Sequence, residues 1–111
     1  MPNEYIISSD SHVFEPPDLW TQRIEKKYLH RAPHMKRVNE QDQLFVEGSQ
    51  KISGIGQISD AGKRFSSPEA ISAEGLFDNV HTGGYDPAKH IIDMKLDGVW
   101  GEVLYPSQGL F

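Results

Sequence analysis

The strongest constraint on the fold comes from the last part of the chain, where the signals of a capped helix lead directly into those of a strand. Asp86 is a favoured N-cap residue, and Pro87 follows it at the first helical position. Apolar side chains then recur at helical spacing until Gly98, a residue that readily adopts the left-handed conformation that closes a helix. The β-branched and aromatic run 99–105 predicts a strand, and Pro106 stops it.

A second strand-like run lies near the beginning of the chain. Residues 5–9 are β-branched and aromatic at first and end in small polar residues, as is typical of a buried strand that delivers side chains to a site. The order strand, insertion, helix, strand describes one βαβ unit. We therefore expect residues 5–9 and 99–105 to be neighbouring parallel strands joined by a right-handed crossover.

The insertion between these strands is expected to begin with a helix. Residues 16–18, Pro-Pro-Asp, form a start signal. Trp20, Ile24 and Tyr28 then recur every four residues and would form one apolar stripe. Pro33 marks the expected end of this helix.

The rest of the insertion is expected to contain a small β-hairpin and a long loop. Residues 43–47 and 50–53 are β-like, and residues 48–49 separate them as a turn. Residues 54–84 are rich in glycine, serine and acidic residues, with one expected helical turn at 69–77. Long excursions of this kind in compact enzymes tend to be functional loops.

Composition excludes several classes of partner and site. The 11 basic and 16 acidic side chains give a net charge of −5, which would repel a nucleic-acid backbone. The sequence contains no cysteine, so any metal must be held by histidine and carboxylate side chains. Its apolar runs are far shorter than the roughly 20 residues that a membrane span needs. We expect a cytoplasmic protein with no membrane contact.

Asp10 and His12 are the leading candidates for metal ligands. They lie at the end of the first predicted strand, where residues two apart project to the same side. A carboxylate oxygen and an imidazole nitrogen suit zinc or manganese. An Asp-x-His triplet is weak evidence by itself, because an aspartate that caps a turn beside an unrelated histidine gives the same pattern.

Four segments add to this evidence because they occur in the order found in a known family. Residues 8–20 (SSDSHVFEPPDLW), 83–87 (GGYDP), 93–99 (DMKLDGV) and 102–107 (EVLYPS) resemble the amidohydrolase-related family. This family belongs to the amidohydrolase superfamily and includes relatives of aminocarboxymuconate semialdehyde decarboxylase and γ-resorcylate decarboxylase. The resemblance covers residues 5–20 and 83–110.

The resemblance implies an α/β fold, in which residues 1–111 are the N-terminal part of a (β/α)8 TIM barrel with a long insertion, a helix plus a small hairpin, after the first strand. A complete barrel needs roughly 250 residues, so the remainder is expected to be absent from this chain. The family binds one divalent ion, zinc or manganese, at the barrel mouth, and Asp10 and His12 fall on its acidic-x-His pair. Its further histidine ligand and catalytic aspartate belong to later strands.

The function implied is that of a metal-dependent hydrolase, in which metal-activated water hydrolyses a C–N bond of a small-molecule substrate. Two alternatives stay open: a non-oxidative decarboxylase, a carbon–carbon lyase acting on aromatic or related carboxylic acids, and a catalytically inert fragment or interaction scaffold. The chain alone is expected to be inactive. A homo-oligomer is compatible with the full-length protein.

Other polar residues near the strand ends are candidates for supporting roles. Glu15 can reach the same mouth, either to orient His12 or to contact substrate, and the alternative is a solvated loop acid. Tyr105 and Ser107 lie where barrel enzymes place substrate-contacting groups, although Tyr105 suits packing equally well. The remaining histidines are expected at exposed positions: His30, His34, His81 and His90.

Overall fold

The computed structural model describes residues 4–47, 49–51, 55, 60, 63–72 and 75–110. The chain divides into two compact units. One unit is built from both ends of the chain, residues 1–15 and 82–111, and the other from residues 16–81.

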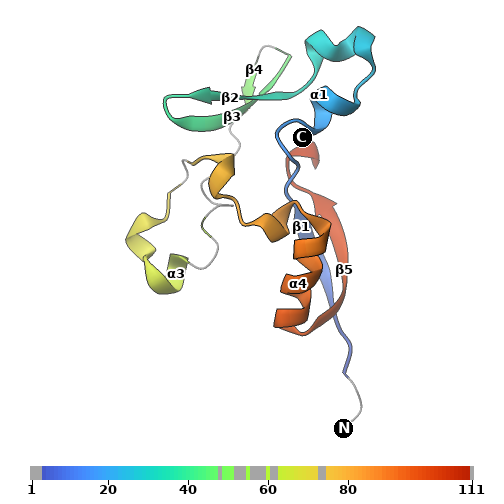
Figure 1. Ribbon diagram of the computed structural model, residues 1–111, viewed down its shortest axis with the longest axis vertical. Coiled ribbons are helices and arrows are strands. Elements are labelled where there is room, and N and C mark those ends of the chain that lie inside the picture. Colours follow the sequence, from blue (N-terminus) through green and yellow to red (C-terminus); the bar gives the residue numbers. More distant parts are fainter. Residues whose placement is uncertain are drawn as a thin grey trace. The chain divides into compact units, whose positions relative to one another are not determined.

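The first unit contains the predicted βαβ arrangement (Figure 1). Strand β1 (Ile6–Val13) pairs in parallel with β5 (Val99–Pro106). Helix α4 (Pro87–Asp97) directly precedes β5 and contacts it. The parallel pairing of the two predicted strands, and the helix between them, are therefore confirmed.

Local capping explains where α4 begins and ends. The Asp86 carboxylate accepts hydrogen bonds from the backbone N–H groups of Ala88 (2.9 Å) and Lys89 (3.2 Å), as an N-cap residue should. At the other end Gly98 has a φ of 71° and is left-handed, and its N–H donates to the Lys95 carbonyl. Both predicted caps are confirmed.

Strand β1 is longer than predicted and contains an irregularity beside the candidate site. Ser8 pairs with Glu102 and Ser11 with Leu104, so β1 has one more residue than β5 in this interval. The hydroxyl oxygens of Ser8 and Ser11 lie 2.6 Å apart across the irregularity. Such bulges bend a strand and redirect its side chains, and Asp10 lies inside this one.

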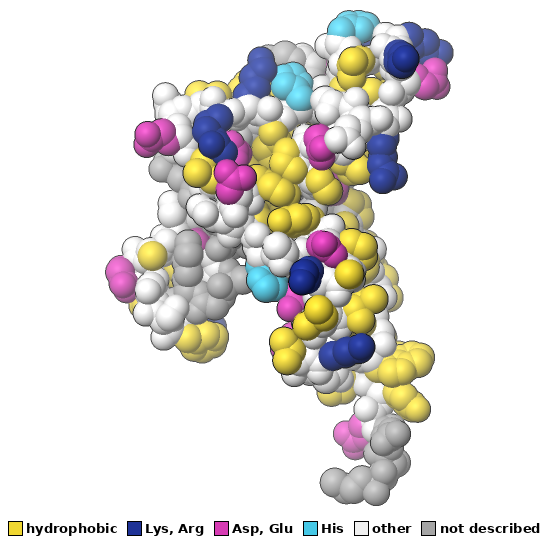
Figure 2. Space-filling view, viewed as in Figure 1, with side chains coloured by type: hydrophobic (Ala, Val, Ile, Leu, Met, Phe, Trp, Pro, Cys, Tyr) yellow, Lys and Arg dark blue, Asp and Glu magenta, His cyan; other side chains and the backbone are white. Residues whose placement is uncertain are grey.

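The sheet of the first unit leaves many large apolar side chains exposed. Within the described residues, β1 and β5 pair only with each other. Figure 2 shows hydrophobic side chains gathered on the region where Figure 1 places α4. The exposed apolar residues of this unit are Tyr5, Ile6, Ile7, Ile91, Ile92, Leu96, Trp100, Val103, Leu104 and Tyr105.

The second unit contains a three-stranded antiparallel sheet in the order β2-β3-β4. Its strands are β2 (His34–Val38), β3 (Gln41–Val46) and β4 (Ser49–Lys51). The predicted hairpin is the β3–β4 pair, although residues 52–53 of its second strand lie outside the described residues. Strand β2 was not predicted from the sequence.

The prediction of one continuous helix over residues 16–33 is wrong. The structure has a short helix α1 (Leu19–Arg23) and then a 3-10 helix η1 (Lys26–Arg31). Between them Ile24 is extended, with φ −69° and ψ 149°, and its N–H closes α1 on the Trp20 carbonyl. The β-branched Ile24 is better suited to this extended geometry than to a helix interior, and the expected apolar stripe is divided between two helices.

The segment 54–84, which was expected to be a long loop, contains only short helices among its described residues. They are α3 (Lys63–Ser66) and the 3-10 helices η2 (Pro68–Ala70), η3 (Phe77–Asn79) and η4 (Thr82–Gly84). The helical turn expected at 69–77 is thus replaced by η2 and η3, which lie at the ends of that segment. Across the described residues, no helix has the length and apolar character needed to cross a membrane.

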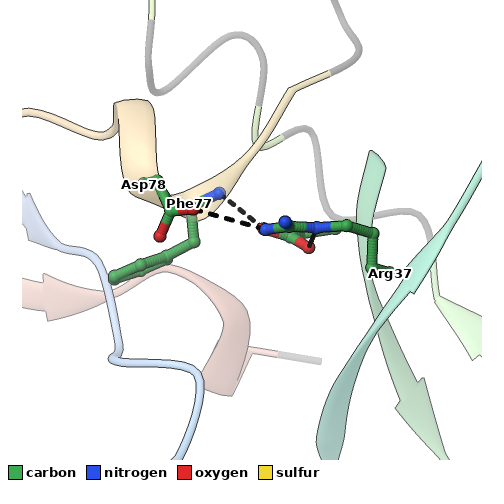
Figure 3. A network of polar contacts seen from close by, with 4 residues as sticks. Arg37, Phe77 and Asp78 are labelled. Atoms are coloured by element: carbon green, nitrogen blue, oxygen red, sulfur yellow. Dashed lines mark hydrogen bonds and ion pairs between the residues drawn. The ribbon is translucent and has the colours of Figure 1, made fainter. Parts of the chain in front are cut away.

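A polar network connects the sheet of the second unit to η3 (Figure 3). The Asp42 carboxylate accepts hydrogen bonds from Arg37 Nε (3.0 Å), Arg37 Nη2 (3.2 Å) and the Phe77 N–H (2.8 Å). Asp78 adds a 3.4 Å contact to the same guanidinium. The hydrogen bond from Arg37 is the main reason why the pKa of Asp42 lies below its ordinary value of 3.8, and the Phe77 amide lowers the pKa further.

We expect Asp42→Ala to lower the free energy of unfolding by about 1–3 kcal/mol, because the Phe77 amide loses a charged acceptor. The lowered pKa means that this contribution is present above the unfolded value of 3.8 and disappears as the pH falls through the folded value. Urea denaturation at neutral and acid pH measures both effects. Asp78→Asn is the control, because the Asp78 side chain is 77% exposed and should matter little. Equal stability of Asp42→Ala and the parent at neutral pH would contradict the prediction.

Candidate metal centre

Asp10 and His12 project from β1 toward a common point. Asp10 Oδ1 and His12 Nε2 lie 3.3 Å apart, and the two side chains are 79% and 45% exposed. Two ligand atoms bound to zinc at about 2.0–2.1 Å with a tetrahedral angle lie about 3.4 Å apart. This separation is compatible with two ligands of one divalent ion.

The other ring nitrogen of His12 is engaged by the end of β5. His12 Nδ1 lies 3.2 Å from the carbonyl oxygen of Pro106. A proton on Nδ1 can be donated to that carbonyl, which leaves the lone pair of Nε2 directed toward Asp10. Metal-binding histidines characteristically use one nitrogen for the metal and donate the other N–H to an oxygen acceptor. A metal ion at Nε2 would take the place of a proton there.

Tyr105 and Ser107 flank this pair from the β5 side. Tyr105 is the register partner of His12, and the two ring centroids lie 5.9 Å apart. The hydroxyl of Ser107 donates to the Val13 carbonyl at 2.8 Å. Ser107 thus holds the end of β1 against the segment after β5, whereas Tyr105 lies beside the imidazole.

Glu15 is a buried carboxylate and not a solvated loop acid. It is 6% exposed. Its Oε1 accepts hydrogen bonds from the N–H groups of Ser107 and Gly109, both at 3.1 Å, and its Oε2 accepts one from Gln108 at 2.9 Å. The side chain therefore holds three consecutive backbone amides around the 3-10 helix η5 (Gln108–Leu110).

Asp10 and His12 are two candidate ligands, fewer than a catalytic metal site uses. Among the residues that the structure describes, no three His, Asp or Glu side chains come together as a metal-binding group. A catalytic zinc site uses three protein ligands and keeps one open position.

His90 occupies a different environment from the exposed one expected from the sequence. It is half-buried, with Nδ1 2.7 Å from the Gly83 carbonyl and Nε2 2.5 Å from Glu102 Oε2. The hydrogen bond to Glu102, and then that to Gly83, raise the pKa of His90 above 6.5. An acidic residue within an otherwise apolar strand is the one sequence signal that could have indicated this pair.

His34 also departs from the expectation of an exposed position. It is half-buried in β2, where its ring stacks on Phe45 with centroids 6.0 Å apart. Its Nδ1 lies 2.9 Å from the Ala32 carbonyl. His30 and His81 are exposed, as expected.

Comparison with known proteins adds no assignment to this geometry. No protein-family model matches the chain, and no curated protein sequence matches it significantly.

Proposed function

We propose that this chain supplies the first two ligands of the metal site in a metal-dependent hydrolase of the amidohydrolase-related type, which cleaves a C–N bond in a small molecule. The observation that carries the proposal is the arrangement of Asp10 and His12. Their ligand atoms are 3.3 Å apart, both side chains are accessible, and the second nitrogen of His12 faces a backbone carbonyl.

The surroundings of the pair support a place at the mouth of a (β/α)8 barrel. Asp10 and His12 lie in the carboxyl-terminal half of β1, and Ser107 directly follows β5. Barrel enzymes assemble their sites at this end of parallel strands. The exposed apolar side chains of both strands are suited to burial by further βα units of the same barrel.

The residues of this chain would hold and orient the ion. The Asp10 carboxylate would contribute negative charge, and when His12 Nε2 binds the ion, the Pro106 carbonyl would accept a hydrogen bond from Nδ1–H. When bound, a zinc or manganese ion polarises a substrate carbonyl and lowers the pKa of water. The remaining ligand and the catalytic base would come from other parts of the full-length protein.

Metal analysis of the full-length protein tests the proposal. We expect about one equivalent of zinc or manganese in the parent, and a large loss of metal in Asp10→Ala and His12→Ala after dialysis against a weak chelator. His30→Ala is the matched control, because His30 is an exposed histidine in the other unit. Full metal content in both site variants would show that this pair does not bind the ion.

A further inference from the structure

We propose that His90 is a pH-sensitive link, which in its protonated form fastens the 3-10 helix η4 to α4 and, through η4, holds the residue that follows β1. Both ring nitrogens of His90 are engaged. Nδ1 lies 2.7 Å from the Gly83 carbonyl oxygen, and Nε2 lies 2.5 Å from Glu102 Oε2. No metal or substrate takes part, so this role is independent of the proposed function.

The protonation state of His90 decides how many of these two hydrogen bonds form. An imidazolium ring has two N–H donors and can donate to both oxygens, whereas a neutral ring has one donor. A carboxylate is a stronger acceptor than a neutral carbonyl, so the remaining proton should stay on Nε2, facing Glu102. The unprotonated Nδ1 would then face the Gly83 carbonyl oxygen without a proton between them. The hydrogen bond lost on deprotonation is therefore the one to η4.

Two carboxylates act on the charge of His90. Glu102 comes from β5, and Asp93 lies about one turn further along α4, while η4 (Thr82–Gly84) contributes no charged side chain. The hydrogen bond to Glu102, and then that to the Gly83 carbonyl, raise the pKa of His90 above 6.5, although burial lowers it. The link is thus fully formed below pH 6.5 and is lost as the pH rises through the folded value.

Helix η4 also holds the backbone directly after β1. The Phe14 N–H donates to the Gly84 carbonyl at 2.7 Å, and Phe14 is 3% exposed. Gly83, whose carbonyl faces His90, is buried and directly precedes Gly84. Because the two carbonyls belong to consecutive residues, a shift of the first displaces the second. Loss of the His90 hydrogen bond should therefore weaken the hold on the Phe14 amide.

The position of η4 in the chain gives this link a possible consequence for the whole first unit. That unit consists of residues 1–15 and 82–111, so η4 is the point at which the chain re-enters it after residue 81. Phe14 lies at the other boundary, one residue before the chain leaves the unit. The hydrogen bond between Phe14 and Gly84 closes the two boundaries on each other, and His90 supports that closure from α4.

Amide hydrogen exchange of the 111-residue chain, measured by NMR between about pH 5.5 and 9, tests the link. We expect the protection factors of the Phe14 amide and of the Asp86 amide, which donates to the Thr82 carbonyl at 2.8 Å, to fall by about 10-fold as the His90 ring loses its proton. This is the usual effect of one hydrogen bond to a buried acceptor. The Met94 amide, inside α4, should keep its protection.

Two variants distinguish a pH-sensitive link from a merely structural contact. Glu102→Gln should move the step in protection to lower pH, because a neutral amide holds the ring proton less strongly than a carboxylate. His90→Gln should abolish the step, since its side chain does not titrate. His30→Ala is the matched control, because it removes an exposed histidine from the other unit and should leave the step unchanged.

The parent chain alone can overturn the proposal, whether or not the variants fold. Constant protection of Phe14 across the titration of the His90 ring would show that η4 is not held by the imidazolium. An equal loss of protection at Met94 would mean that the whole unit opens, and a local link would then be the wrong description. A step that stayed at the same pH in Glu102→Gln would assign the titration to another group.

Discussion

Replacing His90 with alanine is expected to lower the free energy of unfolding of the unit that contains β1, α4 and β5 by about 2–3 kcal/mol below neutral pH. The Glu102 side chain is 12% exposed and would lose its charged partner. The Gly83 carbonyl would lose its donor as well. Removing one member of a largely buried pair is costly because the other member stays behind, charged and unsatisfied.

The same pair should make the stability of this unit depend on pH. The pKa of His90 is raised above 6.5, first by the hydrogen bond to Glu102 and then by the Gly83 carbonyl, and the nearby Asp93 adds to the effect. A raised folded pKa means that the stabilisation is fully present below pH 6.5 and disappears as the pH rises through the folded value. Above it, a neutral ring can donate to only one of its two acceptors.

Urea denaturation over a pH series, followed by the fluorescence of Trp100 in a Trp20→Phe background, measures this unit separately. The parent should lose stability between pH 6.5 and the folded pKa, and His90→Ala should lack this loss. His30→Ala is the control, because it removes an exposed histidine from the other unit. Parallel pH profiles of the parent and His90→Ala would contradict the role of His90.

The βαβ unit could be predicted because its signals are local. Asp86 and Gly98 determine the two ends of α4 through backbone geometry within a few residues. The residue types in the strand-like runs at either end of the chain favour β structure over other conformations. The bulge in β1 could not be predicted from the sequence, because it depends on the register between β1 and β5.

Strand β2 was missed because its turn lacks the usual residues. Val38 pairs with Gln41 across a two-residue turn, in which Asn39 and Glu40 have φ values of 51° and 62°. Turns in which both residues are left-handed favour Asn-Gly or Asp-Gly. Because Glu40 occupies the position where glycine is usual, the sequence does not indicate a turn here. The break in the first helix was missed for a related reason, since the periodicity of its apolar residues continues through Ile24 although the backbone does not.

The candidate site shows the same division between local and long-range information. Two-residue spacing predicted that Asp10 and His12 face one point, and Asp10 Oδ1 and His12 Nε2 lie 3.3 Å apart. The partners of Glu15 lie more than 90 residues away along the chain, and the three hydrogen bonds go to backbone amides, which carry no sequence signal. The His90–Glu102 pair likewise depends on the packing of α4 against β5.

The largest effect is expected at the proposed metal site, where Asp10→Ala and His12→Ala should each weaken zinc binding by more than about 100-fold. Loss of a group that merely orients a ligand already costs about 10- to 100-fold, and a lost ligand should cost more. If both side chains hold one ion, the double variant should bind zinc far more tightly than the product of the two single effects predicts. Once one ligand is lost, the other contributes less to the free energy of zinc binding than it does when both are present.

Competition with a chromogenic zinc chelator measures the zinc affinities of the parent, the two single variants and the double variant. Turnover of a panel of nitroanilide amides should fall in parallel with zinc occupancy, and excess zinc should partly restore it in the single variants. Asp97→Asn serves as the control for loss of an exposed carboxylate. Strictly additive effects of Asp10→Ala and His12→Ala would mean that the two residues act independently, and a shared ion between Oδ1 and Nε2 would then be the wrong description of this site.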